Sequence, residues 1–185
     1  AYLRGLIDDG SMSEAVTNYT QEDARTQFIT GKSAMMINGP WELATLTKDA
    51  QFDWDVAPLP KDKRAATSMG GENVVVMNGA KQSDAAVKLA KFLTSAEGAK
   101  IYCDGSGQLS SRPDLQGKLK LSNDAKLKVF ESQLADAHAR AYGKDYPKIS
   151  EAIQLSMQEA LTGASTPEAA AKKAADSINP LLPKN

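Results

Sequence analysis

Residues 28–41 read Phe-Ile-Thr-Gly-Lys-Ser-Ala-Met-Met-Ile-Asn-Gly-Pro-Trp, which combines a helix end, an apolar run, a turn and a helix start. Gly31 can take the positive φ that ends a helix, and Ser33–Ile37 is a short, mostly apolar run typical of a buried strand. Asn38 and Pro40 predict a turn into a new helix, with Asn38 as its cap and Pro40 at the first helical position. This order predicts a helix–strand–helix unit of an α/β protein.

Trp41 falls on the first turn of the second helix, directly after the predicted strand and turn. An indole at that place offers a flat apolar face and one N–H donor, which suits stacking on the C–H face of a sugar ring. Most Trp side chains are largely buried, so a Trp that plugs the domain core fits the residue type equally well. Both roles stay open for Trp41. We count Trp41, and Asn38 of the same turn, among the candidate ligand-binding residues.

The composition is that of a globular chain without a strong charge bias. Its 185 residues are 42% hydrophobic and 24% charged, which is enough to bury a core. The net charge of −1 and the pI near 5.9 leave no basic footprint, so we predict no nucleic-acid partner. No apolar run approaches the roughly 18 residues of a membrane span, and no signal peptide is visible at Ala1. Cys103 and His138 are each the only residue of their type, so we predict no disulfide, no metal and no cofactor.

Helical and strand patterns alternate along the first half of the chain. The sequence Thr-Gln-Glu-Asp at residues 20–23 is a capping box that predicts a helix over about residues 21–30. Runs of β-branched and apolar residues predict strands at Asp53–Pro58 and Asn73–Met77, which would share one sheet with residues 34–37. The predicted fold class is α/β, with short, mostly buried strands flanked by helices.

The second half of the chain is predominantly helical by its apolar spacing. The predicted helices cover residues 83–93, 95–102, 123–139, 149–161 and 167–180. Ser83, Ser95 and Thr166 are the expected N-terminal caps of three of them. Residues 104–121 have the Gly, Ser and Pro content of a loop between two helical blocks, and we interpret them as a crossing between lobes.

Seven short stretches of the chain form an ordered series of motifs. They are Thr20–Trp41, Val56–Pro60, Gly70–Gly71 before Val74–Val76, Lys91–Leu93 with Glu97–Gly98, Leu109–Arg112, Ala139–Arg140 followed by Tyr146, and Ala160–Gly163 with Pro167–Ala170. In this order, the series resembles the extracellular solute-binding proteins of ABC importers, in particular the maltose-binding-protein-like group. One departure concerns residues 140–144, which read Arg-Ala-Tyr-Gly-Lys where relatives often have Arg-Pro-x-x-Pro, so the exact ligand stays open.

The resemblance implies a two-lobe α/β fold, about twice the length of this chain, with the ligand between the lobes. It implies that this chain matches the carboxy-terminal half, with residues 1–105 and 139–185 in the C-terminal ligand-binding lobe. Residues 106–138 would then cross over and pack on the absent N-terminal lobe. The implied partners are a carbohydrate, that N-terminal lobe and an ABC permease in the membrane. The implied location is extracytoplasmic, in the periplasm or tethered as a lipoprotein to the outer face of the cytoplasmic membrane.

Four consecutive residues are candidates for direct ligand contact. Gly70 and Gly71 precede a predicted strand, where absent side chains let the main chain approach a ligand. Glu72 and Asn73 follow, and a carboxylate beside an amide can accept from and donate to adjacent sugar hydroxyls. A bulge or a solvated loop without any ligand is the alternative interpretation of the same residues.

Three further candidates lie later in the chain. Arg140 offers a fork of donors for hydroxyls, a carboxylate or a phosphate, although an ordinary surface ion pair fits it nearly as well. Tyr142 can stack on a ligand. Arg112 lies in the crossing loop and would face the absent lobe.

The sequence favours a non-enzymatic receptor for a mono- or oligosaccharide taken up by an ABC importer. A receptor of the same fold for a polyol phosphate or another small polar solute is the first alternative. A glycoside-processing enzyme is a weaker one, in which Glu72 with Asp53 or Asp55 would supply the two carboxylates. The chain lacks a nucleophile elbow, a phosphate-cradling loop and a dinucleotide fingerprint, and no catalytic residue is predicted.

Overall fold

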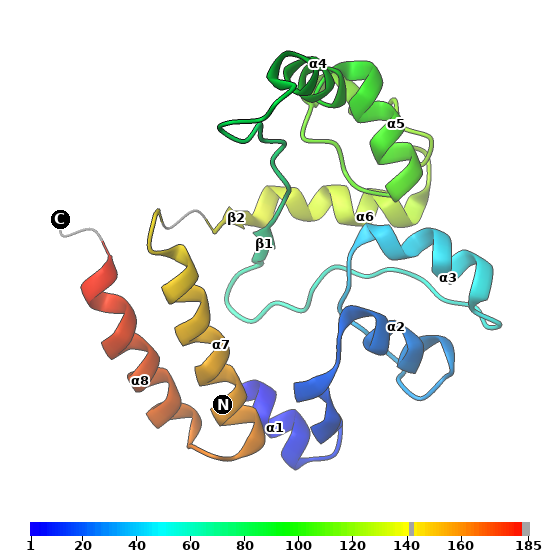
Figure 1. Cartoon of the computed structure of the whole chain (residues 1–185). Helices are drawn as coiled ribbons and strands as arrows, with labels where there is room; N and C mark the ends of the chain where they lie inside the picture. Colours follow the sequence, from blue (N-terminus) through cyan, green and yellow to red (C-terminus); the bar gives the residue numbers. More distant parts are fainter. Residues whose placement is uncertain (141–142, 183–185) are drawn as a thin grey trace. The chain divides into compact units, whose positions relative to one another are not determined.

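The computed structural model describes residues 1–140 and 143–182, and the chain divides into two compact units (Figure 1). One unit comprises Ala1–Ala24 with Arg140–Asn185, and the other comprises Arg25–Ala139. Both are predominantly helical, and the small parallel sheet lies in the second. Within the described residues, no helix combines the length and the apolar character that crossing a membrane requires.

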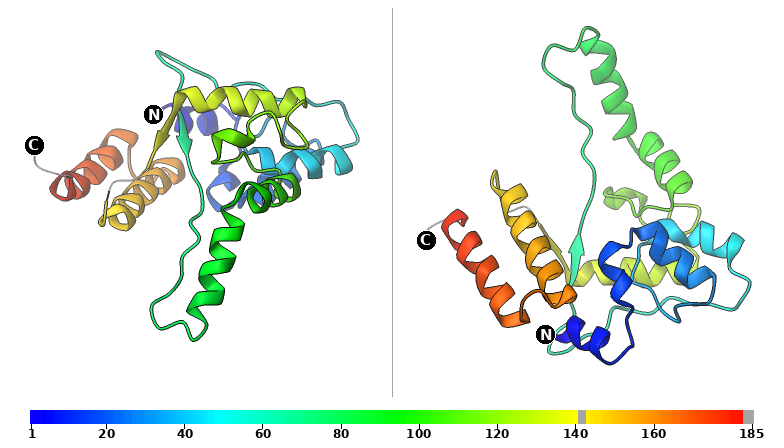
Figure 2. Two further views of the ribbon diagram at one scale, coloured as in Figure 1. Left: turned by 90° about the horizontal axis from the view of Figure 1, so that it is seen from above. Right: turned by 60° about the horizontal axis from the view of Figure 1, so that its bottom comes forward.

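The first unit is built on a pair of helices near the end of the chain. Its elements are α1 (Tyr2–Asp8), η1 (Glu14–Asn18), α7 (Tyr146–Thr162), α8 (Pro167–Ile178) and η5 (Asn179–Leu181). α7 and α8 lie side by side in all the views of Figures 1 and 2. Ile149 of α7 and Ala170 of α8 are buried. Arg4 of α1 donates from Nη1 to the Leu161 carbonyl at 2.7 Å, which places a cation near the carboxyl end of α7, where the helix dipole favours it.

Local signals fix the ends of these helices as the sequence predicts. Gly163 ends α7 in the left-handed region at φ +74°, and the Thr166 hydroxyl accepts from the Ala169 amide at 3.2 Å to cap α8. The same holds for α2 (Gln21–Ile29), where the predicted capping box is complete. The Asp23 amide donates to Thr20 Oγ1 at 3.2 Å, and the Thr20 amide donates to the Asp23 carboxylate at 2.9 Å.

The second unit contains the remaining helices and both strands. Its elements after α2 are η2 (Pro40–Glu42), α3 (Leu43–Asp49), β1 (Thr67–Met69), α4 (Ser83–Leu93), α5 (Ala96–Ser106), η3 (Pro113–Leu115), α6 (Ala125–Gln133), η4 (Leu134–Asp136) and β2 (Ala137–Ala139). β1 and β2 pair in parallel, with Thr67 opposite Ala137 and Met69 opposite Ala139. Leu43, Leu46, Cys103, Leu115 and Leu127 are its buried apolar side chains.

The three strands predicted at residues 33–37, 53–58 and 73–77 are wrong in position. Residues 33–39, 53–58 and 70–77 contain no strand (Figure 2). Met35, in the first of these segments, is 84% exposed. An apolar, β-branched run favours extended backbone, but a strand exists only where a neighbouring chain segment accepts its hydrogen bonds. The paired strands lie instead in Thr67–Met69 and Ala137–Ala139. The predicted α/β class is nevertheless confirmed, and the small sheet of the structure is parallel.

Two helix predictions also need correction. The helix predicted over residues 123–139 ends at Gln133, because the chain tightens into η4 and then enters β2, where pairing with β1 replaces helical hydrogen bonds. Ser83 is the first residue of α4 and not its cap, which is Gln82. Ser95, by contrast, caps α5 as predicted, with its Oγ accepting from the Gly98 amide at 3.1 Å.

Polar contacts fasten the loop after α5 to that helix. Lys100 Nζ lies 2.7 Å from Asp104 Oδ2 and also donates to the Lys118 carbonyl at 2.8 Å, while the Lys120 amide donates to Asp104 Oδ1 at 2.6 Å. The hydrogen bond from Lys100, followed by that from Lys120, holds the pKa of Asp104 below its usual value. Residues 106–138 thus share a compact unit with residues 25–105. Their additional packing on an N-terminal lobe stays a prediction.

Candidate functional site

The turn before α3 presents Trp41 between buried neighbours. Pro40 occupies the first position of η2, as predicted, whereas the N-terminal cap is Gly39 and not Asn38. Gly39, Pro40 and Glu42 are buried, and Trp41 between them is 38% exposed. The buried neighbours fix the backbone on both sides of Trp41, and its partial exposure leaves some of the residue accessible to a stacking partner.

Gly39 is the residue on which the indole rests. A Cβ placed on Gly39 would lie 2.1 Å from Cη2 and 2.2 Å from Cζ3 of Trp41, which is far inside contact distance. The backbone of Gly39 is extended, at φ −115° and ψ 174°, so any residue type could adopt it. The space taken by the indole, and not backbone strain, is therefore the reason for a glycine at residue 39.

A buried carboxylate ties the two ends of the turn together. Glu42 Oε2 lies 3.1 Å from Arg25 Nη1 of α2, and Glu42 Oε1 accepts from Asn38 Nδ2 at 3.4 Å. The side-chain oxygen of Asn38 accepts from the Gly39 amide at 2.9 Å. The Asn38 amide, predicted as a ligand contact, thus has two partners within the turn.

The end of α5 supports the turn from another side. Gly107 ends α5 in the left-handed region at φ +71°. A Cβ on Gly107 would lie 3.2 Å from the Pro40 carbonyl oxygen and 3.4 Å from the Trp41 Cα, so the two backbones are close neighbours. The position of Trp41 is thereby set by contacts from α2 and α5 as well as by its own turn.

The predicted contacts Gly70, Gly71, Glu72 and Asn73 form an exposed segment after β1. A Cβ on Gly71 would meet nothing within 4 Å, so no close neighbour in the described chain demands a glycine there. The described hydrogen bonds and ion pairs do not join this segment to the Trp41 turn. Its role in ligand contact stays a prediction.

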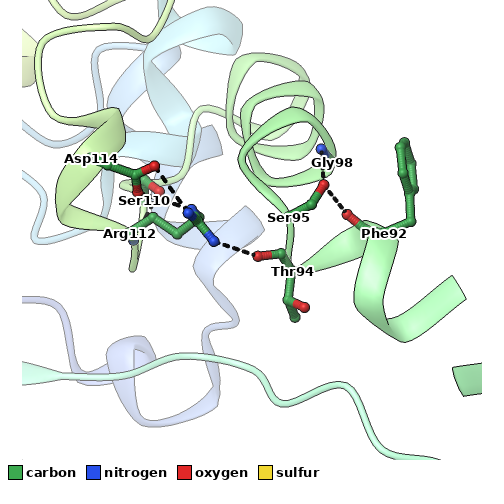
Figure 3. Close-up of polar contacts among 7 residues, drawn as sticks. All are labelled: Phe92, Thr94, Ser95, Gly98, Ser110, Arg112 and Asp114. Carbon is green, nitrogen blue, oxygen red and sulfur yellow. Dashed lines mark hydrogen bonds and ion pairs between the residues drawn. The ribbon is translucent and has the colours of Figure 1, made fainter. Parts of the chain in front are cut away.

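Arg112 has partners within the chain (Figure 3). Its guanidinium donates from Nε and Nη2 to the Asp114 carboxylate, each at 3.0 Å, and from Nη1 to the Thr94 carbonyl at 3.0 Å. The hydrogen bond with Asp114 raises the pKa of Arg112, and the same bond lowers the pKa of Asp114. These contacts fasten the loop to the corner between α4 and α5.

At that corner, Gly98 of α5 has no room for a side chain. A Cβ on Gly98 would lie 2.1 Å from the Phe92 carbonyl oxygen, and Ser95 Oγ donates to the same oxygen at 2.7 Å. The contacts of Arg112 are those of a residue that stabilises the local fold. A role of Arg112 in ligand binding stays a prediction.

Arg140 and Tyr142 are the last two predicted ligand contacts. Arg140 is exposed and belongs to the first unit, whereas the turn of Trp41 belongs to the second. Tyr142 lies outside the described residues. The predictions for both residues stay as the sequence analysis made them.

Cys103 and the acidic side chains give no reactive cluster in the described part of the chain. Burial raises the pKa of the Cys103 thiol, which disfavours the thiolate that a nucleophile needs. Asp55, a carboxylate of the glycosidase alternative, lies 3.8 Å from Lys126. Within residues 1–140 and 143–182, no group of three or more His, Cys, Asp or Glu side chains could hold a metal ion.

Arg25 and Glu42 are the members of the site that sequence reasoning missed. One signal for Glu42 was available, because a charged residue directly after Trp41 and four residues after Asn38 lies within one helical turn of both. Arg25 carried no such signal, since its contact with Glu42 depends on the packing of α2.

The sequence of this chain is similar to those of bacterial solute-binding proteins. Residues 1–129 match the profile of a family described as bacterial extracellular solute-binding protein. A binding protein of Brucella abortus is 26% identical over 184 residues, covering 98% of this chain and 45% of that protein. A maltooligosaccharide ABC transporter solute-binding lipoprotein of Streptococcus pneumoniae is 32% identical over 103 residues, covering 54% of this chain and 24% of that protein.

A solved structure extends the comparison to the fold. The crystal structure of an ABC transporter solute-binding protein from Thermotoga lettingae, bound with alpha-D-tagatose, superposes with a TM-score of 0.78 at 33% identity. The match covers 89% of this chain and 43% of that protein. Both the Brucella and the Thermotoga protein match nearly all of this chain, and the chain spans about half the length of each of them.

Proposed function

This chain belongs to the family of bacterial extracellular solute-binding proteins, and from that premise we propose that it supplies one wall of a sugar-binding cleft in the receptor of an ABC importer. Membership confirms the resemblance predicted from the sequence. The ligand, the permease and the transport role are proposals for this chain, because it spans about half the length of the relatives compared with it.

The observation that carries the proposal is the partial exposure of Trp41 on an anchored turn. Trp41 is 38% exposed, although Gly39, Pro40 and Glu42 around it are buried. Sugars present C–H faces that stack on such rings, and their hydroxyls need polar partners nearby. Relatives whose names include maltooligosaccharide and maltotriose, and the structure with alpha-D-tagatose, support a carbohydrate as the ligand.

The proposed mechanism is binding without chemical change. Trp41 would supply the stacking surface, and polar groups of the Gly70–Asn73 segment would supply hydrogen bonds to hydroxyls. Closure of a second wall over the sugar would create the form that an ABC permease reads, outside the cytoplasmic membrane. The relatives are binding proteins, which supports the absence of catalysis.

A sugar panel tests the proposal. The chain is titrated by calorimetry with maltose, maltotriose, D-tagatose and a polyol phosphate, and each mixture is then analysed by chromatography for products. One wall covers only part of a ligand, whereas closed pockets cover 70–90% or more, so we expect affinity of roughly millimolar, about −4 kcal/mol.

The outcomes separate the candidate functions. Binding with unchanged sugar supports the receptor, whereas hydrolysed products would support the glycosidase alternative. Heat from a polyol phosphate but not from any sugar would favour a receptor for that alternative solute. Micromolar sugar affinity would contradict the view that the chain supplies only one wall.

A further inference from the structure

Glu42 is a buried carboxylate whose two oxygens each face a donor. It is 4% exposed, with Arg25 Nη1 at 3.1 Å from Oε2 and Asn38 Nδ2 at 3.4 Å from Oε1. A buried charge is costly unless it is paired and hydrogen-bonded, so these two partners account for its presence. The two partners do not explain why this carboxylate belongs to the residue directly after Trp41.

The place of Glu42 matters because its contacts span the Trp41 turn. Asn38 lies three residues before Trp41, and its side chain reaches forward to Glu42 and back to the Gly39 amide. The link from Asn38 to Glu42 closes the turn, and the link from Glu42 to Arg25 fixes it to α2. Movement of Trp41 as a unit with its turn would require breaking one of these contacts.

We propose that Arg25, Glu42 and Asn38 form a positioning network that holds the Trp41 indole against Gly39, in the orientation that stacks on a sugar. None of the three side chains needs to touch the sugar for this role. The network gives preorganisation, because a ring already held in its bound orientation loses less conformational freedom on binding. The inference rests on the proposed function of Trp41 as the stacking surface.

The chemistry of residue 42 gives the proposal a specific test. Two donors face it, so it must offer two acceptors, and the carboxylate of Glu does so. Glu42→Gln has nearly the same shape but only one acceptor oxygen, so its amide nitrogen must face a donor. The Arg25 guanidinium, being charged, would keep the oxygen, and the link to Asn38 would be lost.

A second substitution should restore the network. In the double variant Asn38→Asp with Glu42→Gln, the new amide donates to the Asp carboxylate and accepts from Arg25. The second Asp oxygen can still accept from the Gly39 amide. The double variant has the same net charge and the same number of hydrogen bonds as the original network, so it separates lost geometry from lost charge.

The experiment uses the full chain with Trp54→Phe, which leaves Trp41 as the only tryptophan. Acrylamide quenching and anisotropy decay of Trp41 are measured without sugar, and maltotriose is then titrated. Far-UV circular dichroism verifies the fold of each variant. Asp49→Asn, at an exposed residue of α3 outside the network, is the matched control for loss of one negative charge.

We expect Glu42→Gln to raise the quenching and local mobility of Trp41 and to weaken maltotriose binding about tenfold, the effect of one charge-assisted hydrogen bond. Asp49→Asn should change neither quantity. The double variant should return quenching to that of the parent. An unchanged Trp41 signal in folded Glu42→Gln would overturn the proposal, as would failure of the double variant to restore it.

A second variant and the sugar-free Trp41 signal test the network independently of Glu42→Gln folding and of sugar binding. Asn38→Ala leaves the ion pair of Arg25 and Glu42 in place, so it reports on the same link if Glu42→Gln fails to fold. Its Trp41 quenching must also rise, and a parent value would overturn the network. If no sugar binds the parent chain, the proposed function fails, while the sugar-free signal still decides the network.

Discussion

The helical pair α7–α8 and the apolar segments at residues 33–37 and 73–77 differ in what holds them in place. α7 ends at Gly163 in the left-handed region, α8 begins at the Thr166 cap, and the two helices bury Ile149 and Ala170 within their unit. Within the described residues, neither apolar segment is paired with a strand, and Ile37 is 77% exposed. A helix satisfies its backbone locally, whereas a strand depends on a neighbour that its own sequence does not specify.

The largest expected effect tests this difference directly. Ile149 is 2% exposed, so Ile149→Ala should cost about 3 kcal/mol of unfolding free energy through lost burial and a cavity. Ile37→Ala, the same change in an exposed segment, should cost no more than about 0.5 kcal/mol. Urea denaturation followed by circular dichroism measures both. Similar costs for the two variants would show that residues 33–37 are packed, and the comparison would fail.

A smaller effect is expected from the cap of α8. The Thr166 hydroxyl accepts from the Ala169 amide, so Thr166→Ala should cost about 1 kcal/mol and leave that amide without its partner. Thr166→Ser keeps the hydroxyl and serves as the control. Hydrogen exchange of the first-turn amides of α8 should speed up in Thr166→Ala only. Equal exchange in the two variants would mean that packing, and not the cap, holds the start of α8.

The smallest effect concerns the loop after α5 and depends on pH. The pKa of Asp104 is lowered, so its contribution to stability is complete above the unfolded value of about 3.9 and is lost as the pH falls through the lower folded value. Asp104→Asn should cost at most about 1 kcal/mol at neutral pH, since the side chain is partly exposed.

The difference between Asp104→Asn and its parent should shrink in acid. Asp62→Asn, which removes one negative charge from an exposed loop, is the control for the change in net charge. A difference that stays constant from pH 7 to pH 2 would show that the Asp104 contacts do not depend on its charge.

Several helix ends could be predicted from the sequence because their signals lie within a few residues. The capping box at Thr20 and Asp23, the Ser95 cap and the Gly163 stop are all present as predicted. The true strands could not be recognised, since Thr67–Met69 and Ala137–Ala139 are short and pair across about 70 residues of sequence. A three-residue strand carries too few alternating positions for a pattern to show.

The candidate site shows the same division. The start of η2 at Pro40 agrees with the local pattern of residues 38–41, whereas that pattern left the exposure of Trp41 open. The contact of Arg25 with Glu42, and the close approach of Gly107 to the turn, join segments distant in sequence and had no local signal. Arg112 has Asp114 and the Thr94 carbonyl as partners, and these contacts likewise could be recognised only in the folded structure.

The central claim is that Trp41 is a stacking surface and not part of the core. The most direct measurement compares Trp41→Ala with its parent for maltotriose binding and for the urea midpoint on the same samples. We expect binding to disappear while the unfolding free energy falls by much less than the roughly 3–5 kcal/mol of a buried Trp. A large fall in the midpoint, or undiminished sugar binding by Trp41→Ala, would contradict it.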